Sequence, residues 1–217
     1  MTIADKTILI TGASRGIGRT LVDEALRRGA KRLYAGTRGP LPHADPRVTG
    51  VKLDVTSAED IEHAVASIGS LGVLVNNAGI APYDDLSNPE VLKRTFAVNL
   101  FGVLNVTRAF LPLLKRSRGA VVNQLSMVAL AALPLIPAYW ISKAAAPNLT
   151  QSLRALLAGD GVKVHGVVLG PVDTDMNRGL DIPKATTESV ARGIFDGLER
   201  GEEDIFPDPA SQSAGLL

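Results

Sequence analysis

The sequence predicts an α/β fold, a doubly wound parallel sheet of about seven strands with helices on both faces, in a single domain that spans residues 1–217. Two observations predict it. Short apolar runs alternate with amphipathic helical stretches from one end to the other, which is typical of parallel strands joined by helical crossovers. A glycine-rich turn also follows the first apolar run and opens the first helical stretch.

The predicted elements follow one another in order. Residues 6–11 are a continuous apolar run, as expected for a strand buried on both faces of a parallel sheet. Residues 17–28 have an amphipathic pattern that ends at Gly29, which predicts a helix. By the same criteria, further strands are predicted at 32–37, 51–54, 73–76, 120–125, 162–169 and 204–206, and further helices at 58–68, 89–115, 139–158 and 188–199.

Composition excludes several classes of protein. The chain has no cysteine, which excludes a disulfide framework, a zinc–thiolate site and a thiol nucleophile. Its formal net charge of +1 gives no field that favours nucleic acid or an anionic membrane. No cluster of ligands predicts a metal site.

The ends and apolar stretches of the chain predict a cytoplasmic protein without a membrane anchor. The first residues begin a strand pattern and lack the long apolar core of a signal peptide. The most apolar stretch, residues 127–141, contains Pro134 and Pro137 and is shorter than the ~20 residues that a spanning helix needs.

The glycine-rich turn predicts a phosphate-binding site. Gly12, Gly16 and Gly18 lie between a predicted strand and a predicted helix, where unpaired backbone amides can bind a pyrophosphate. Their spacing differs from the tighter Gly-x-Gly-x-x-Gly pattern of many dinucleotide sites. Taken alone, the glycines can also serve close packing with no ligand.

The end of the second predicted strand favours NADP(H) over NAD(H). An NAD site generally places a carboxylate there, on the ribose hydroxyls. This chain has Thr37 and Arg38 instead, and Arg15 lies in the glycine turn. Arginine suits a 2′-phosphate through its planar fork of donors. Alternatively, both arginines are solvated surface residues.

Tyr139 and Lys143 predict a general acid/base. Positions i and i+4 project from one helix face, and a nearby ammonium lowers the pKa of a phenol from about 10. Ser126 follows a predicted strand, and Asn99 interrupts an apolar helical stretch where asparagine is a poor helix former. No histidine and carboxylate accompany Ser126, which disfavours a serine hydrolase.

In combination, these residues resemble the short-chain dehydrogenase/reductase family over nearly the whole chain, with each fragment weak but their joint order and spacing highly specific. The resemblance implies a Rossmann-type fold with strand order 3-2-1-4-5-6-7. The matching positions are residues 11–18, Asp54, Val55, residues 76–79, Asn99, Ser126, Tyr139, Lys143 and residues 170–174.

The resemblance also implies a catalytic tetrad. Tyr139 would donate a proton to a substrate carbonyl while hydride arrives from the nicotinamide, and Ser126 would hydrogen-bond the same oxygen. Lys143 would lower the Tyr139 pKa and hold the nicotinamide ribose. Asn99 would hold a water that links Lys143 to solvent.

The cofactor expected from these observations is NADP(H). The residues expected to bind it are Gly12, Ser14, Arg15, Gly16, Ile17, Gly18, Thr37, Arg38, Asp54, Val55, Asn76, Ala78, Gly79, Tyr139, Lys143, Val172 and Thr174.

The substrate pocket is predicted from the apolar residues after Ser126 and from a substrate loop at about 175–187. Its expected lining favours a small, neutral, hydrophobic carbonyl compound, because a charged substrate would find few partners. The residues expected to line it are Met127, Val128, Leu133, Trp140, Gly170, Pro171 and Met176. Trp140 stands where the family has a small residue, and Pro147 lies inside the predicted catalytic helix.

The function predicted is reversible NADPH-dependent reduction of a hydrophobic ketone or aldehyde. One alternative is an NADP(H)-binding redox sensor without turnover. Another is a sugar-nucleotide epimerase or dehydratase, although only about forty residues follow Thr174 to build a substrate domain. By the same resemblance, the two long helical stretches would form a subunit contact, which implies a homodimer or homotetramer.

Overall fold

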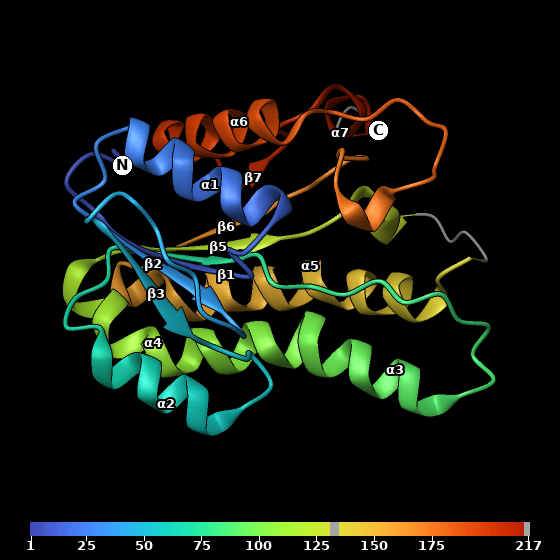
Figure 1. The fold of residues 1–217 in the computed structure, drawn as a ribbon, viewed down its shortest axis with the longest axis horizontal. Coiled ribbons are helices and arrows are strands. Elements are labelled where there is room, and N and C mark those ends of the chain that lie inside the picture. Colours follow the sequence, from blue (N-terminus) through green and yellow to red (C-terminus); the bar gives the residue numbers. More distant parts are fainter. Residues whose placement is uncertain (131–134, 215–217) are drawn as a thin grey trace.

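A computed structural model describes residues 1–130 and 135–214 of the chain. Its centre is one parallel sheet with the strand order β3-β2-β1-β4-β5-β6-β7 (Figure 1). The predicted fold class and strand order are therefore confirmed. The strands are β1 (Thr7–Thr11), β2 (Arg32–Thr37), β3 (Val48–Lys52), β4 (Val73–Asn76), β5 (Ala120–Gln124), β6 (Lys163–Val167) and β7 (Asp204–Ile205).

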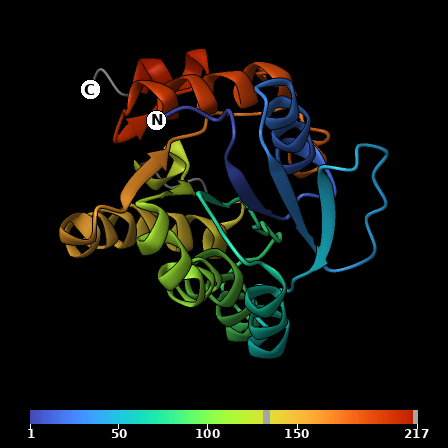
Figure 2. The same ribbon diagram turned by 90° about the vertical axis from the view of Figure 1, so that its left-hand side faces the viewer.

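Helices cover both faces of the sheet, which gives three layers (Figures 1 and 2). On one face lie α1 (Gly16–Arg27) and α6 (Thr187–Arg200), and on the other α2 (Ala58–Ser67), α4 (Val103–Ser117) and α5 (Pro137–Leu157). The remaining elements are α3 (Pro89–Phe96), the π-helix η1 (Ala97–Gly102), the 3₁₀ turns η2 (Met127–Leu130), η3 (Ala158–Asp160) and η4 (Asp175–Asn177), and α7 (Pro209–Ala214).

Two apolar cores follow from the alternation of side chains along the buried strands. Ile8 and Ile10 of β1 belong to the core under α1 and α6, together with Phe195. Leu9, between them, belongs to the core under α2, α4 and α5, together with Phe110. Each strand thus feeds both layers, which is why these runs are apolar at every position.

The strand β3 begins three residues earlier and ends two residues earlier than the sequence predicts. It pairs with the whole of β2, from Leu33 opposite Val48 to Thr37 opposite Lys52. Asp54, placed in the strand by the prediction, instead lies in a turn where its carboxylate accepts hydrogen bonds from the amide and hydroxyl of Thr56.

The long predicted helix at 89–115 is a composite of α3, η1 and α4. By length and composition the stretch Pro89–Ser117 could cross a membrane. The core helix of a globular protein meets the same criteria, and Val106, Phe110 and Leu114 of this stretch are fully buried. Length and composition alone therefore do not distinguish a membrane-spanning helix from a buried core helix in this stretch.

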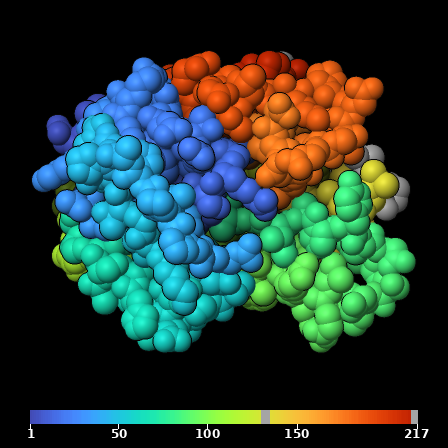
Figure 3. All heavy atoms as spheres, in the orientation of Figure 1, coloured from blue at the N-terminus to red at the C-terminus, as the bar shows by residue number. Residues whose placement is uncertain are grey.

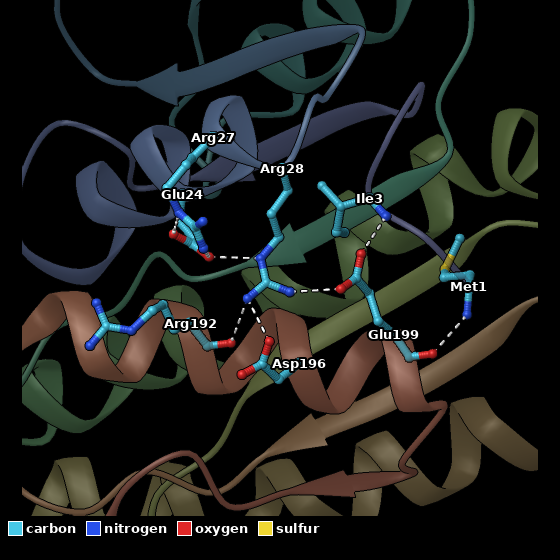
Figure 4. Close-up of polar contacts among 8 residues, drawn as sticks. All are labelled: Met1, Ile3, Glu24, Arg27, Arg28, Arg192, Asp196 and Glu199. Atoms are coloured by element: carbon cyan, nitrogen blue, oxygen red, sulfur yellow. Dashed lines mark hydrogen bonds and ion pairs between the residues drawn. The ribbon is translucent and has the colours of Figure 1, made fainter.

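Arg28 joins α1 to α6 on the side of the sheet away from α5 (Figure 4). Its guanidinium donates to Glu24 of α1 and, on α6, to Asp196, Glu199 and the carbonyl of Arg192. It also lies 5.8 Å from the ring centroid of Phe195. Glu199 in turn accepts from the Ile3 amide, so one half-buried cation ties the N-terminus and both helices together.

Candidate active site

The glycine turn connects β1 to α1 at the carboxyl edge of the sheet, and its glycines are sterically required. Gly12 and Gly16 have φ of +66° and +53°, which disfavours side chains. A Cβ on Gly12 would lie 2.9 Å from the Ala78 Cα, and one on Gly18 would lie 2.3 Å from the Gly12 carbonyl oxygen. The turn is therefore packed tightly against the end of β4, with the first amides of α1 beside it.

Asn77 and Thr11 hold this turn in place. The Asn77 side chain donates to the carbonyl oxygens of Thr11 and Gly12 at 2.8 and 3.1 Å. The Thr11 hydroxyl accepts from the amides of Asn77 and Ala78, both at 3.0 Å. The sequence analysis gave Asn77 no role of its own. Asn77 belongs to the matching stretch 76–79, however, and like Asn76 it lies at the end of a buried strand and before Gly79.

The side chain of Asn76, which was predicted to bind the cofactor, lies in a network of buried neutral side chains. It is buried and donates to the Thr107 hydroxyl at 3.0 Å and to Asn123 Oδ1 at 2.9 Å. Asn123 in turn donates to the Thr150 hydroxyl at 3.1 Å. Because successive strand side chains alternate, Asn76 points to the α4 and α5 side whereas Asn77 points to the glycine turn.

Two arginines lie near the glycine turn and the end of β2. Arg38 is exposed, directly after the buried Thr37. Arg15 is also exposed and pairs with Asp175 of η4 at 3.4 Å. An exposed pair of this kind is weak, so Arg15 remains available to an anionic ligand.

Asp54 and Val55, expected near the adenine, are placed differently from each other. Asp54 is half-buried in the turn after β3. The Val55 side chain belongs to the core and packs against η1, where a Cβ on Gly102 would lie 2.7 Å from the Val55 Cγ2. Any contact of Val55 with a cofactor therefore falls to its backbone.

Tyr139, Ser126 and Lys143 come together at the carboxyl edge of β5. Ser126 follows β5, and its side chain is hydrogen-bonded to that of Tyr139. The Lys143 ammonium donates to the Gln124 carbonyl oxygen at 2.8 Å and lies 5.8 Å from the Tyr139 ring centroid. The first turns of α5 and the end of β5 thus present an acid, a hydroxyl and a cation side by side.

The predicted effect of Lys143 on Tyr139 is not found in this structure. Burial raises the pKa of the Tyr139 phenol above 10, and the hydrogen bond from Ser126 offsets only part of that rise. Burial also lowers the pKa of Lys143 to about 8. The helical i, i+4 spacing is present, but the ammonium is directed to a sheet carbonyl and not to the phenol oxygen.

The Asn99 side chain joins three segments of the chain through hydrogen bonds. It lies in the π-helix η1, and π-turns within α-helices are frequent at functional sites. Its side-chain oxygen accepts from the Ile80 amide, and its nitrogen donates to the Ile80 carbonyl, each at 2.9 Å. The same nitrogen donates to the Ser142 hydroxyl, which donates to the Tyr139 carbonyl. Both amide protons of the side chain are thus used within the protein, so a bound water could reach Asn99 only through the second lone pair of its amide oxygen or through its backbone.

The segment after β6 lies against the glycine turn. A Cβ on Gly16 would lie 3.3 Å from the Thr174 methyl group, so the two segments touch. Val172 is buried in the core, and its carbonyl accepts from the Asn177 side chain at 2.8 Å. A cavity of about 440 Å³ opens here between Gly16, Arg19, residues 173–175, Arg178, Gly179, Lys184 and Thr187.

Figure 3 shows the surface hollowed between the N-terminal part, the segment around 170–185 and the segment around 80–100. Of the predicted pocket residues, Met176 is 48% exposed on η4, whereas Met127, Val128, Gly170 and Pro171 are half-buried. Leu133 lies outside the described residues.

Trp140 is buried within its own chain. Only 6% of its surface is exposed, so its ring does not protrude into solvent and does not need a subunit contact to bury it. Its indole nitrogen makes no hydrogen bond within the described part of the chain. In residues 1–130 and 135–214, no group of three or more His, Asp or Glu residues gathers to hold a metal ion.

A sequence model described as short chain dehydrogenase matches residues 6–184. The chain belongs to this family. Its relatives include the 2-(S)-hydroxypropyl-CoM dehydrogenase 3 of Xanthobacter autotrophicus, which is 36% identical over 208 residues that cover 88% of this chain and 82% of the relative. A sorbitol dehydrogenase of Cereibacter sphaeroides is 32% identical over 207 residues, which cover 89% of this chain and 80% of the relative.

Solved structures of family members have the same fold. A short chain dehydrogenase from Burkholderia cenocepacia in complex with NADP has a TM-score of 0.95 and 36% identity, and the match covers 100% of this chain and 93% of that one. An NADPH-bound carbonyl reductase from chicken fatty liver has a TM-score of 0.83 and 26% identity, over 94% and 99% of the two chains. As a family member, the protein is an NAD(P)-dependent oxidoreductase.

Proposed function

We propose that the protein is a cytoplasmic NADPH-dependent reductase of hydrophobic ketones or aldehydes, acting reversibly, with Tyr139 as the general acid. One observation carries this proposal. Tyr139 lies beside the Ser126 hydroxyl and one helical turn before Lys143 at the carboxyl edge of β5, and burial, which raises the pKa of the phenol, favours its protonated form. Reduction of a carbonyl requires this protonated form, whereas oxidation of an alcohol requires the phenolate.

The described residues fit a nicotinamide dinucleotide. The close approach of Gly12 and Gly18 to their neighbours leaves no room for side chains, and the amides that open α1 are suited to a pyrophosphate. When bound, the reduced cofactor supplies hydride. The chain supplies the rest: Tyr139 donates a proton to the carbonyl oxygen, Ser126 hydrogen-bonds that oxygen, and Lys143 provides a positive charge nearby.

The preference for NADPH rests on charge at the end of β2. Thr37 and Arg38 occupy the positions where a carboxylate would select the ribose hydroxyls of NAD(H). Arg15 and Arg38 are both exposed and can pair with a 2′-phosphate. The NADP complex of the Burkholderia relative, at 36% identity, supports the same choice.

A hydrophobic substrate is favoured by apolar residues of the segment 175–184, whose polar residues Asp175, Arg178 and Lys184 line the cavity. Met176, Leu180 and Ile182 expose 48, 37 and 45% of their surfaces. Apolar side chains left this exposed beside a cleft are suited to contact an apolar ligand.

The test is to follow NADPH and NADH oxidation by the purified protein with a panel of hydrophobic ketones and aldehydes. We expect turnover with NADPH, a loss of about 10²- to 10⁴-fold in Tyr139→Phe, and little turnover with NADH. The double variant Arg15→Ala, Arg38→Ala should raise the KM for NADPH and leave that for NADH unchanged. Tight NADPH binding without turnover on any carbonyl would instead support a redox sensor.

We also infer that a second copy of this chain covers the outer faces of η1, α4 and α5. A hollow of about 470 Å³ lies there, lined by Leu100, Phe101, Leu104, Ala145, Asn148, Leu149 and Ser152. Phe101 is 51% exposed at its edge. In light scattering, the wild type should be a dimer or tetramer and Phe101→Lys should be smaller; a monomeric wild type would exclude this assembly.

A further inference from the structure

The helix that carries Tyr139 begins with an unusual cap. Ile136 precedes α5 and has no polar side-chain atom with which to satisfy the first amides of the helix. The Ala138 amide instead donates to Asp84 Oδ2 at 3.2 Å, from a loop 54 residues earlier in the chain. A carboxylate is also favoured at this end of a helix by the helix dipole.

Asp84 also shapes its own loop. Its second oxygen, Oδ1, accepts from the Leu86 amide at 3.2 Å. Leu86 has φ of +64°, a left-handed conformation that is unfavourable for leucine and needs support from its surroundings. One half-buried carboxylate therefore binds both the strained loop and the start of α5.

The same loop is attached to α5 at a second point. Ile80, where the loop leaves β4, is held on both its backbone groups by Asn99. Asn99 donates to Ser142, and Ser142 donates to the Tyr139 carbonyl. The loop is thus bonded to α5 on both sides of the Tyr139 side chain. One bond is to the Ala138 amide, and the other runs through Asn99 and Ser142 to the Tyr139 carbonyl.

We propose that Asp84 is a positioning residue that fixes the first turn of α5, and with it the Tyr139 hydroxyl, relative to Ser126. Lys143, one turn further on, has its own anchor on the Gln124 carbonyl and does not depend on Asp84. Loss of the cap would therefore move the acid without moving the cation. This inference rests on the proposed reductase reaction for its kinetic consequence but not for its structural one.

The kinetic test compares Asp84→Ala with Asp85→Ala. Asp85 lies in the same loop and accepts from the Ser87 amide at 3.0 Å, a contact within the loop itself, so it is a matched control. We expect Asp84→Ala to lower kcat roughly 10-fold with the Kd for NADPH, measured by calorimetry, within two-fold, because a displaced acid slows proton transfer and the glycine turn still holds the cofactor. Asp85→Ala should leave both unchanged.

The variant Asp84→Asn tests whether Asp84 acts through its hydrogen bond to the Ala138 amide or through its negative charge. In Asp84→Asn the single amide oxygen can still accept from the Ala138 amide although the contact with the Leu86 amide is lost, so kcat should return to within about three-fold of the wild type. Equal losses of kcat in Asp84→Ala and Asp85→Ala, or no loss in either, would overturn the proposal. A loss in Asp84→Asn as large as in Asp84→Ala would also overturn it.

Amide hydrogen exchange gives a test that does not need turnover. First-turn amides have no partner within a helix, and Ala138 is buried, so the contribution of Asp84 is the protection of the Ala138 amide that is lost in Asp84→Ala and kept in Asp85→Ala. We expect at least 100-fold protection at Ala138 in the wild type, and equal protection in Asp84→Ala would refute the assignment. If Asp84→Ala alone loses this protection while no carbonyl is reduced, the placement of Asp84 stands and the proposed reaction fails.

Discussion

The two sides of the sheet are held by different kinds of polar contact. On the α1 and α6 side, Arg28 bonds Glu24, Asp196 and Glu199 in a cluster of charges at the molecular surface (Figure 4). On the α4 and α5 side, Asn76, Thr107, Asn123 and Thr150 bond one another in a buried chain of neutral groups.

The two kinds of contact respond differently to salt and pH. Charges at a surface are screened by salt and respond to pH, whereas neutral groups in a low-dielectric interior are insensitive to both. The neutral network lies under the strand and helix that bring Ser126, Tyr139 and Lys143 together. The side that bears the chemistry is thus shielded from the conditions that weaken the other side.

The largest expected effect breaks the neutral network. Asn123→Ala removes one of the two acceptors of the Asn76 amide and the donor to the Thr150 hydroxyl, and leaves a cavity among buried polar groups, although Asn76 keeps its bond to Thr107. We expect a loss of about 2–5 kcal/mol in the free energy of unfolding, measured by urea denaturation. The loss should be the same at 0.05 and 1 M NaCl; a strong dependence on salt would contradict the comparison.

Lys143 is a buried charge close to the neutral network, and it should lower the stability of the fold. Burial lowers its pKa from 10.5 to about 8, so between these values the unfolded chain binds more protons and stability rises with pH. Lys143→Met should be more stable than the wild type by about 3 kcal/mol at pH 7, and this advantage should vanish as the pH approaches 10.5. A difference that does not change with pH would show that the ammonium is well solvated.

A smaller effect is expected on the ionic side. Arg28→Ala leaves Glu24 poorly solvated, with 8% of its side chain exposed, and we expect a loss of about 1–3 kcal/mol that shrinks in 1 M NaCl. The matched control is Arg27→Ala, because Arg27 also pairs with Glu24 but is 62% exposed, and it should have a much smaller effect.

The same cluster sets an acid dependence. The hydrogen bond from Arg27, followed by the contacts with Arg28, lowers the pKa of Glu24 below 4.5 against the opposing effect of burial. This stabilisation is therefore present above pH 4.5 and is lost as the pH falls through the lower, folded-state value. Unfolding curves of Arg28→Ala and the wild type should converge in that range; parallel curves would refute the assignment.

The smallest expected effect is a gain. Pro147 lies inside α5, which continues unbroken from Pro137 to Leu157, and it cannot donate to the Lys143 carbonyl. Pro147→Ala should raise the free energy of unfolding by about 1 kcal/mol and the Tm by roughly 2–4 °C in calorimetry. Pro112→Ala in α4 offers a comparison at a second interior proline. An unchanged or lower Tm in Pro147→Ala would show that α5 is not strained.

The sequence predicts the strands and most helices because these depend on the period of apolar residues, which is a local property, whereas the strand order follows only from the resemblance to the family. It misplaces β3 because the start of an edge strand is set by pairing with β2, at Leu33 opposite Val48. The short α7 carries no such periodicity and was not predicted.

The candidate site is predicted less evenly, for a physical reason. The residue types and their spacing identify Ser126, Tyr139 and Lys143, and strand alternation would have separated Asn76 from Asn77. The contacts that set their chemistry are long-range. The hydrogen bonds from Lys143 to the Gln124 carbonyl and from the Ala138 amide to Asp84 join residues far apart in the sequence. No local pattern of residues predicts them.

Trp140 is the single tryptophan of the chain, directly after Tyr139 and almost wholly enclosed. Its fluorescence therefore reports on one place, the first turn of α5, with no signal from elsewhere in the protein. An enclosed indole emits at shorter wavelengths than one in water, and reduced nicotinamide absorbs in the same range. Cofactor arrival and any loosening of that turn can thus be watched as quenching and as a red shift, in real time and without a label.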